Sequence, residues 1–286
     1  MNKKSTNNIS SFKVPKSILL TGKILQTISN DLATRFAAKI FATPIKFKVP
    51  ERELMMRKSA KKDLVEIASI KKEIMVYSYG YSKKKVLLVH GWAGRGTQLF
   101  QLADKILENK MMVITFDGPA HGLSSGKTTL MTEFIETIHH LEKKFGPFDM
   151  AVGHSFGAMA LLNAVKSGLN IKKLVTIGAD NSITEITKQF VQKLQLNQVI
   201  SHKMVTFYEK KHSIKADQFS SQNAAKKVKI PTLVIHDSDD KFVPVSSAFE
   251  IRQNLDKGEL LITNGLGHHK IFKNQQIINR IIDFIK

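Results

Sequence analysis

Eight short apolar segments recur along the chain, and they limit its possible folds more than any other feature. The segments are residues 64–70, 73–79, 85–90, 111–117, 148–154, 172–179, 231–237 and 259–263. Stretches with helical spacing separate most of the later ones, at residues 97–108, 128–145, 156–167, 246–254 and 274–285. Strands that are apolar on both faces and alternate with helices form parallel sheets covered on both sides. The sequence therefore predicts an α/β fold with a mostly parallel, eight-stranded sheet that starts with an antiparallel hairpin.

Residues 1–60 form a basic extension that lies outside this alternation. Apolar side chains recur at helical spacing over residues 17–42, at Leu25, Ile28, Leu32, Phe36 and Ile40. This spacing predicts one amphipathic helix, which could lie on a membrane surface or pack against the main domain.

Residues 181–230 also interrupt the alternation, because they have helical patterning but no clear strand. We interpret them as a small helical lid inserted between the two core segments, residues 61–180 and 231–286. Their apolar side chains could wall a substrate pocket or simply pack onto the core. These side chains are Phe190, Val191, Leu194, Leu196, Val199, Ile200, Met204, Val205 and Phe207.

The chain carries a formal net charge of +20, half of it in residues 1–61, where 13 Lys and Arg stand against three acidic residues. A basic surface attracts nucleic acid, anionic lipid or acidic substrates. No nucleic-acid-binding module accompanies the charge, so we expect no nucleic-acid partner, and a solvated lysine-rich surface is the simpler explanation. The chain has no cysteine, no bilayer-spanning apolar run and no signal-peptide pattern. We therefore expect a cytoplasmic protein, and its oligomeric state stays open.

Glycine-rich motifs follow two predicted strands, at the sheet edge where ligands bind. Residues 90–96 (HGWAGRG) can turn sharply and direct the amide of Trp92 into a site. Residues 153–157 (GHSFG) place Ser155 on a tight strand-to-helix turn beside the amide of Phe156. Two such amides stabilise the oxyanion of a tetrahedral intermediate. A turn that merely needs small residues has the same pattern, so the partners of the serine decide between the two interpretations.

A nucleophilic serine needs a base, and the base needs an orienting acid. Residues 237–244 (DSDDKFVP) follow one later strand, and residues 264–272 (NGLGHHKIF) follow the next. The resulting chain order of serine, aspartate and histidine is the order that a nucleophile elbow on an open sheet requires.

These motifs resemble those of the α/β-hydrolase superfamily, over about residues 60–286 apart from the insertion. HGWAGRG resembles the oxyanion loop of that family, GHSFG its nucleophile elbow, DKFVP its acid turn and GLGH its histidine loop. FDGPAHGLSSG, at residues 116–126, is similar to a further family loop. The resemblance implies Ser155 as nucleophile, His268 as base and Asp240 as acid, with the amides of Trp92 and Phe156 as the oxyanion hole.

The chain departs from the family pattern at two positions, Ala120 and Asp237, where the family usually or often has glycine. Three acids therefore stand together as possible orienters of the base. The position of Asp240 before Val-Pro favours it over Asp237 and Asp239. Asp180, after the preceding strand, is a further candidate.

Several histidines accompany the predicted site. His269 adjoins His268, and the Gly-x-Gly-His spacing favours His268 as the base. We expect His90, Gly91 and His154 at the substrate-binding site, with the His90 ring holding the oxyanion loop and His154 either fixing backbone or lining the pocket.

The resemblance implies a cofactor-free ester, thioester or amide hydrolase. We expect its small-molecule substrate to be a carboxylic ester with a short to medium acyl chain, although lysines in the insertion could favour an anionic one. An acyltransferase would use the same residues, and a non-catalytic ligand-binding protein could keep the same fold. We expect no metal, because the sequence has neither HExxH nor paired-carboxylate spacing.

Overall fold

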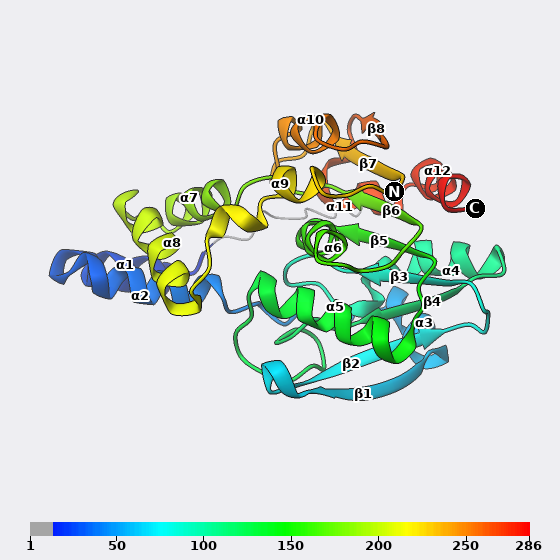
Figure 1. The fold of residues 1–286 in the computed structure, drawn as a ribbon. Coiled ribbons are helices and arrows are strands. Elements are labelled where there is room, and N and C mark those ends of the chain that lie inside the picture. The colour runs from blue at the N-terminus through cyan, green and yellow to red at the C-terminus, as the bar shows by residue number, and fades with distance from the viewer. Residues whose placement is uncertain (1–13) are drawn as a thin grey trace, which may run out of the picture. The chain divides into compact units, whose positions relative to one another are not determined.

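The computed structural model describes residues 14–286, and its centre is one sheet that contains all eight predicted strands (Figure 1). The strands are β1 Lys61–Ile67, β2 Lys72–Tyr79, β3 Lys85–Val89, β4 Met112–Phe116, β5 Met150–His154, β6 Lys173–Ile177, β7 Thr232–Asp237 and β8 Gly258–Thr263. Their order across the sheet is β1-β2-β4-β3-β5-β6-β7-β8. β2 pairs antiparallel with both β1 and β4, and the other neighbouring pairs are parallel. The predicted fold class and the initial hairpin are confirmed.

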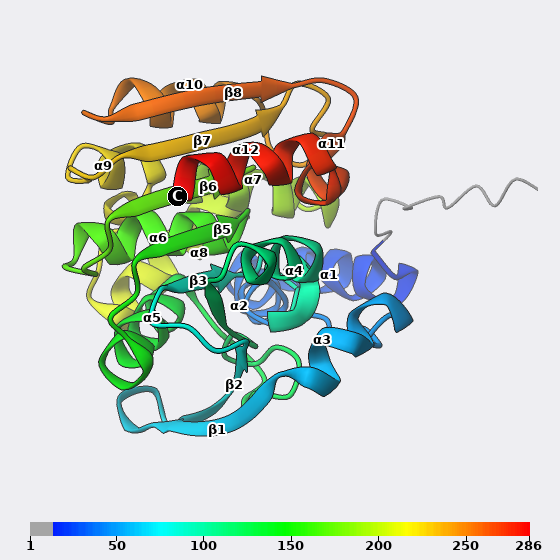
Figure 2. The same cartoon turned by 90° about the vertical axis from the view of Figure 1, so that its right-hand side faces the viewer.

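Helices cover both faces of this sheet, as the apolar strands require. Every residue of β5 and β7 is buried, so neither strand has a solvent-facing side. One face is covered by α3 Leu54–Ser59, α4 Phe100–Glu108 and α12 Gln275–Ile285, which share a hydrophobic core with β3 and β4. The other face is covered by α5 Met131–Phe145, α6 Phe156–Lys166, α9 Ser221–Ala225 and α10 Ser246–Gln253. Figure 2 shows α4 and α12 in front of the strands.

The C-terminal helix illustrates how sequence sets these elements. Asn274 caps α12, because its side-chain oxygen accepts the backbone N–H groups of Gln276 and Ile277. Isoleucines then recur on the side that faces the sheet, and they are Ile277, Ile278, Ile281, Ile282 and Ile285. This apolar side makes α12 amphipathic, and burying it stabilises both the helix and the sheet.

The chain forms two compact units. The first contains the described residues up to Phe41 together with Thr184–Ser213, and the second contains Ala42–Ile183 and Ile214–Lys286. Residues 42–60 and 214–230 therefore belong to the same unit as the sheet. The boundaries predicted from the sequence were at residues 60, 180 and 230. A lid function for residues 181–230 stays a proposal.

The first unit is a cluster of four helices, α1 Lys16–Ile28, α2 Asn30–Phe41, α7 Ile183–Lys193 and α8 Val199–His212. Its core consists of Ala33, Ala37, Ala38, Val191, Leu194, Leu196, Ile200 and Met204. Polar contacts join the same helices outside this core: Lys203 pairs with Asp31 at 2.7 Å on the surface, and the Tyr208 hydroxyl donates to the Ala38 carbonyl. Most apolar side chains of the insertion thus pack with the N-terminal helices.

The prediction of one continuous helix over residues 17–42 is wrong, because the helix is interrupted at Ser29. Ser29 has an extended backbone, with φ −163° and ψ 132°, and its hydroxyl accepts the N–H of Asp31. A serine that bonds nearby backbone in this way competes with helical hydrogen bonding. Ile28 and Leu32 consequently lie on different helices, and both are exposed.

No helix within residues 14–286 has the length and apolar character needed to cross a membrane.

Candidate active site

Ser155 occupies a strained turn between β5 and α6. Its backbone has φ 53° and ψ −121°, a left-handed conformation that a non-glycine residue adopts at a cost of about 1–3 kcal/mol. The side chain is half-buried, whereas all five residues of β5 before it are buried. The turn therefore presents the Ser155 hydroxyl at the carboxyl edge of the sheet.

Two glycines permit this turn because backbone approaches them closely. A Cβ at Gly157 would lie 2.4 Å from the Val89 carbonyl oxygen, and one at Gly153 would lie 2.6 Å from the Ala158 Cα. Both distances are far inside van der Waals contact. The GHSFG motif therefore has glycine at these positions because strand and helix leave no room for a side chain.

The histidine loop comes together with the elbow beside the end of β6. The backbone N–H of Ser155 donates to the Ile177 carbonyl at 2.8 Å. A Cβ at the next residue, Gly178, would lie 3.2 Å from His268 Nδ1 and 3.6 Å from Asp240 Oδ2. The ring of His154 packs on that of His268, with centroids 4.7 Å apart. The structure thus brings the predicted nucleophile, base and acid to one corner of the sheet.

Asp240 contacts the predicted base directly, since His268 Nδ1 lies 2.6 Å from Asp240 Oδ2. The other carboxylate oxygen accepts the N–H groups of Phe242 and Val243, two and three residues later in the same turn. Burial raises the pKa of Asp240, but the hydrogen bonds from His268 and these amides outweigh it and hold the pKa below its usual value. Asp240 is therefore ionised at neutral pH and holds the Nδ1 proton of His268.

Asp237, the unusual acid of this turn, has a different set of partners. One oxygen accepts the N–H groups of Asp239 and Gly267, and the other accepts the Thr263 hydroxyl and the Leu266 N–H. The residue is 1% exposed. Asp237 thus joins the turn that carries the predicted acid to the loop that carries the predicted base.

The remaining candidates for the acid and the base are not part of this aspartate-histidine pair. Asp239 is exposed, and Asp180 accepts the N–H of Asn181 while burial raises its pKa. His269 packs edge-on against Phe242, and burial lowers its pKa to about 4.

The two residues predicted to supply oxyanion amides lie side by side. The rings of Trp92 and Phe156 pack edge to face, with centroids 5.3 Å apart. Phe156 is the first residue of α6, where backbone N–H groups lack partners within the helix. Trp92 belongs to the turn after β3, and a Cβ at its neighbour Gly91 would lie 3.0 Å from the Ser155 Cβ.

His90 and His154, expected at the substrate-binding site, are buried and bonded to backbone. His90 Nε2 accepts the Gly118 N–H, so its proton lies on Nδ1, which donates to the Gly91 carbonyl. His154 Nε2 donates to the His268 carbonyl at 2.9 Å. With exposures of 1% and 2%, these rings hold loops in place and have almost no surface for a substrate.

A second layer of polar residues fixes the predicted oxyanion loop, and its histidine, His121, bonds to backbone as its place in a loop near the site predicts. His121 Nε2 accepts the Ala93 N–H, and Asp117 accepts the N–H groups of Gly96 and Leu123. Both residues belong to the FDGPAHGLSSG motif, whose sequence indicates a loop at the site but not the partners of its side chains.

Glu53 is a buried residue next to the predicted site that the sequence gave no reason to select. Its carboxylate accepts from Arg95 Nε at 2.8 Å and from the Thr97 hydroxyl at 2.8 Å, and its side chain is 2% exposed. Arg95 belongs to HGWAGRG, so this ion pair joins the segment before β1 to the predicted oxyanion loop.

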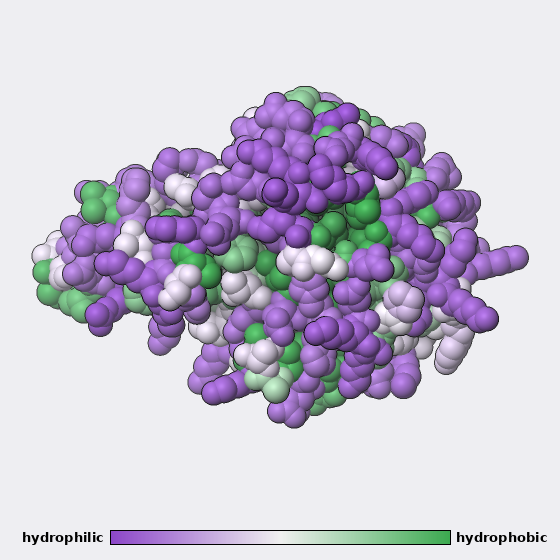
Figure 3. Space-filling model, in the orientation of Figure 1, coloured by the Kyte–Doolittle hydropathy of each residue, from purple (hydrophilic) through white to green (hydrophobic). Residues whose placement is uncertain are grey.

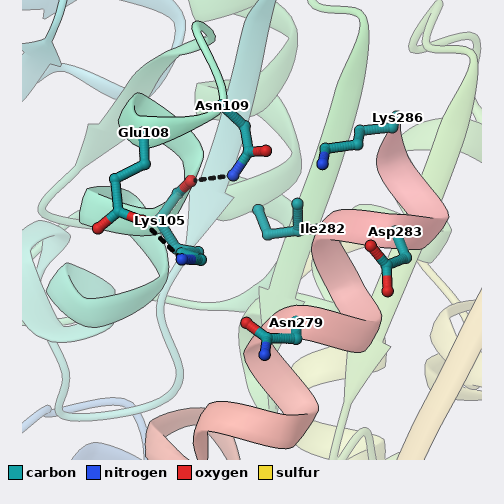
Figure 4. Close-up of a pocket in the computed structure, with 7 residues that line it drawn as sticks. All are labelled: Lys105, Glu108, Asn109, Asn279, Ile282, Asp283 and Lys286. Carbon is teal, nitrogen blue, oxygen red and sulfur yellow. Dashed lines mark hydrogen bonds and ion pairs between the residues drawn. The ribbon is translucent and has the colours of Figure 1, made fainter.

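A surface hollow of about 390 Å³ lies between α4 and α12 (Figure 4). Its lining is polar apart from one isoleucine, and it consists of Lys105, Glu108, Asn109, Asn279, Ile282, Asp283 and Lys286. The figure shows Lys105 paired with Glu108. None of the predicted catalytic residues lines this hollow.

A serine elbow at the carboxyl edge of a mostly parallel sheet, with an aspartate-histidine pair on two later loops, defines the α/β-hydrolase class of protein. Residues 84–198 match the family model described as alpha/beta hydrolase fold, and residues 200–286 match the one described as TAP-like protein. This chain belongs to the α/β-hydrolase superfamily.

Solved structures with the same fold include two esterases. The esterase from Pyrococcus furiosus matches with a TM-score of 0.65 and 17% identity, over 85% of this chain and 97% of that one. The esterase from Exiguobacterium antarcticum matches with a TM-score of 0.62 and 16% identity, over 79% and 99%. A bromoperoxidase from Bacillus anthracis matches with a TM-score of 0.62 and 18% identity, over 79% and 99%. Among curated proteins none matches this chain.

Proposed function

We propose that the protein is a serine hydrolase that cleaves a carboxylic ester through an acyl-enzyme on Ser155. The observation that carries the proposal is the contact between His268 Nδ1 and an ionised, buried Asp240 beside the Ser155 elbow. A structural turn would need the two glycines, but it would not need an aspartate-histidine pair next to it. The esterases among the similar structures favour an ester as the small-molecule substrate.

In the proposed mechanism, His268 Nε2 takes the proton of the Ser155 hydroxyl as the oxygen attacks the ester carbonyl. Asp240 stabilises the imidazolium that forms, and the amides of Trp92 and Phe156 hold the oxyanion. His268 then protonates the leaving alkoxide and activates the water that releases the acid. The strain at Ser155 keeps its hydroxyl directed toward the substrate before the substrate arrives.

Short to medium acyl chains remain the proposed range. The side chains that sequence offered as a pocket wall are largely used in the core of the helical unit, where Val191, Ile200 and Met204 pack against α2. Acyl length is therefore best measured directly on a series of esters.

The test is labelling with a fluorophosphonate, peptide mapping of the adduct, and hydrolysis of p-nitrophenyl esters from acetate to decanoate. We expect the adduct on Ser155, and a loss of kcat of about 10⁴-fold or more in Ser155→Ala. Ser238→Ala, an exposed serine on the acid turn, is the matched control and should keep wild-type rates. A folded wild-type protein without adduct or turnover would overturn the proposal and favour a ligand-binding protein.

A further inference from the structure

Helix α1 has an apolar side that no described residue of its own helical unit covers. Leu20, Ile24 and Ile28 recur every four residues, and their exposed fractions are 61%, 51% and 67%. Side chains at this spacing lie next to one another along one side of a helix. The helix packs through another side, where a Cβ at Gly22 would lie 3.3 Å from the Leu196 side chain. Figure 3 shows apolar surface on the part of the molecule where Figure 1 draws α1.

Basic residues border this apolar side. Lys16 and Lys23 are exposed, and around the helix axis they lie about 40° and 60° from Leu20, both in the same direction. The described residues of the helical unit contain nine basic and three acidic side chains, a net charge of +6. In the sequence, Lys3, Lys4 and Lys13 precede these helices.

We propose that α1 binds the surface of an anionic lipid bilayer through Leu20, Ile24 and Ile28. An interfacial helix buries an aliphatic side at the boundary of head groups and acyl chains, and its lysines contact anionic head groups. The long lysine side chains can extend from the margin of the buried side to the head-group level. The three aliphatic residues thus supply the apolar contact, and Lys16 and Lys23 supply the charge complementarity.

The charge argues for lipid over a second copy of the chain. Two molecules that each carry +20 repel one another, and basic margins would meet basic margins in a symmetric contact. An anionic bilayer instead attracts the same lysines. Nucleic acid would match the charge, but an aliphatic row offers no aromatic surface on which bases stack.

The first experiment is sedimentation of the full chain with vesicles of phosphatidylcholine alone or with about 30% phosphatidylglycerol. The Ser155→Ala variant is used so that lipid hydrolysis cannot alter the vesicles, which makes the result independent of the proposed function. We expect binding to the anionic vesicles at least tenfold stronger than to phosphatidylcholine, and weaker binding at high salt.

A triple substitution, Leu20→Ser with Ile24→Ser and Ile28→Ser, tests the apolar contact. We expect its partition onto anionic vesicles to fall at least tenfold, with an unchanged circular dichroism spectrum because these side chains are exposed. The matched control replaces three exposed apolar residues of the sheet unit, Met55, Tyr81 and Phe249, by serine and should bind as the parent does. Lys16→Glu with Lys23→Glu should lower binding several-fold.

The absence of cysteine allows a direct readout of insertion. An environment-sensitive fluorophore is attached to the single cysteine of the Ile24→Cys variant. The same label on the Tyr81→Cys variant, in the sheet unit, is the control. We expect a blue shift on anionic vesicles only at position 24. Equal binding by the parent and the triple serine variant would overturn the proposal and leave net charge as the cause. A dimer in light scattering that the triple variant abolishes, without vesicle binding, would overturn it in favour of a second copy.

Discussion

The Asp237 carboxylate accepts hydrogen bonds from both the acid turn and the histidine loop, which accounts for an acid at this position of the turn. Its four partners include the amides of Leu266 and Gly267, directly before His268. Burial raises the pKa of Asp237, but the hydrogen bonds from Thr263 and the loop amides outweigh it and lower the pKa. The residue therefore serves as an ionised acceptor that sets the position of the histidine loop.

We expect Asp237→Asn to separate these two loops. The amide nitrogen of asparagine cannot accept a hydrogen bond, so in either orientation at least one backbone N–H loses its acceptor, which should lower the free energy of unfolding by about 1–3 kcal/mol. The resulting shift of His268 should lower kcat for ester hydrolysis about tenfold or more, with little change in KM. Denaturant titration and steady-state kinetics measure both effects.

Asp239→Asn is the control for that change, since Asp239 is exposed and lies in the same turn. It should leave stability and kcat within twofold of wild type. If Asp237→Asn also matched wild type in both measurements, the proposed positioning role would be wrong.

At the scale of elements, the segment before β1 is part of the sheet unit because Glu53 holds it there. The buried carboxylate contacts Arg95 and Thr97, so a residue 42 positions earlier than Arg95 holds the predicted oxyanion loop. Removing one partner of a buried ion pair leaves an uncompensated charge, which typically costs about 3–5 kcal/mol.

Glu53→Ala should therefore destabilise the protein by about that amount and lower kcat more than it raises KM, because the loop carries the Trp92 amide. Glu51→Ala, on the exposed side of the same turn, is the matched substitution and should change neither quantity. Thermal unfolding and ester kinetics on both variants decide the question, and a Glu53→Ala protein as stable as Glu51→Ala would contradict it.

The sheet could be predicted from sequence, because its central strands are apolar on both sides and form contiguous runs such as Val86 to Val89. The break between α1 and α2 could not, since many helices tolerate a serine in their interior and the hydroxyl of Ser29 bonds the Asp31 N–H only once the chain has turned there. Glu53 was missed because residues 42–60 contain two prolines and no periodicity, and an ion pair over 42 positions leaves no local signal. In the site, motif spacing selected Ser155, Asp240 and His268, whose catalytic roles stay a prediction.

For the whole molecule, the buried neutral histidines make stability depend on pH. Burial lowers the pKa of His90 to about 4 and that of His121 to about 3, whereas both titrate near 6.5 when unfolded. The unfolded chain therefore binds more protons than the folded chain between these values. The contribution of these histidines to the free energy of unfolding is fully present above about pH 7. It is lost as the pH falls through 6.5 toward 4.

We expect the free energy of unfolding to decrease by about 1.4 kcal/mol per pH unit for each such histidine between pH 6 and pH 4. Denaturant titrations at several pH values give this slope. His121→Gln can still accept the Ala93 N–H through its side-chain oxygen, so it should remove one histidine's share of the slope. His202→Gln, at an exposed position, is the control and should keep the wild-type slope. A free energy of unfolding that does not change from pH 7.5 to pH 5 would exclude the mechanism.

The composition of the helical unit also has a consequence for synthesis on the ribosome. Ala33, Ala37 and Ala38 of α2 pack against Val191, Ile200 and Met204, so this core draws on two distant parts of the chain. At about 5–20 residues per second, the ribosome needs roughly 7–30 s to make the residues in between. During that interval the N-terminal segment has been made without its packing partners. A chaperone or a nearby membrane surface can therefore bind this segment before residues 184–213 pack against it.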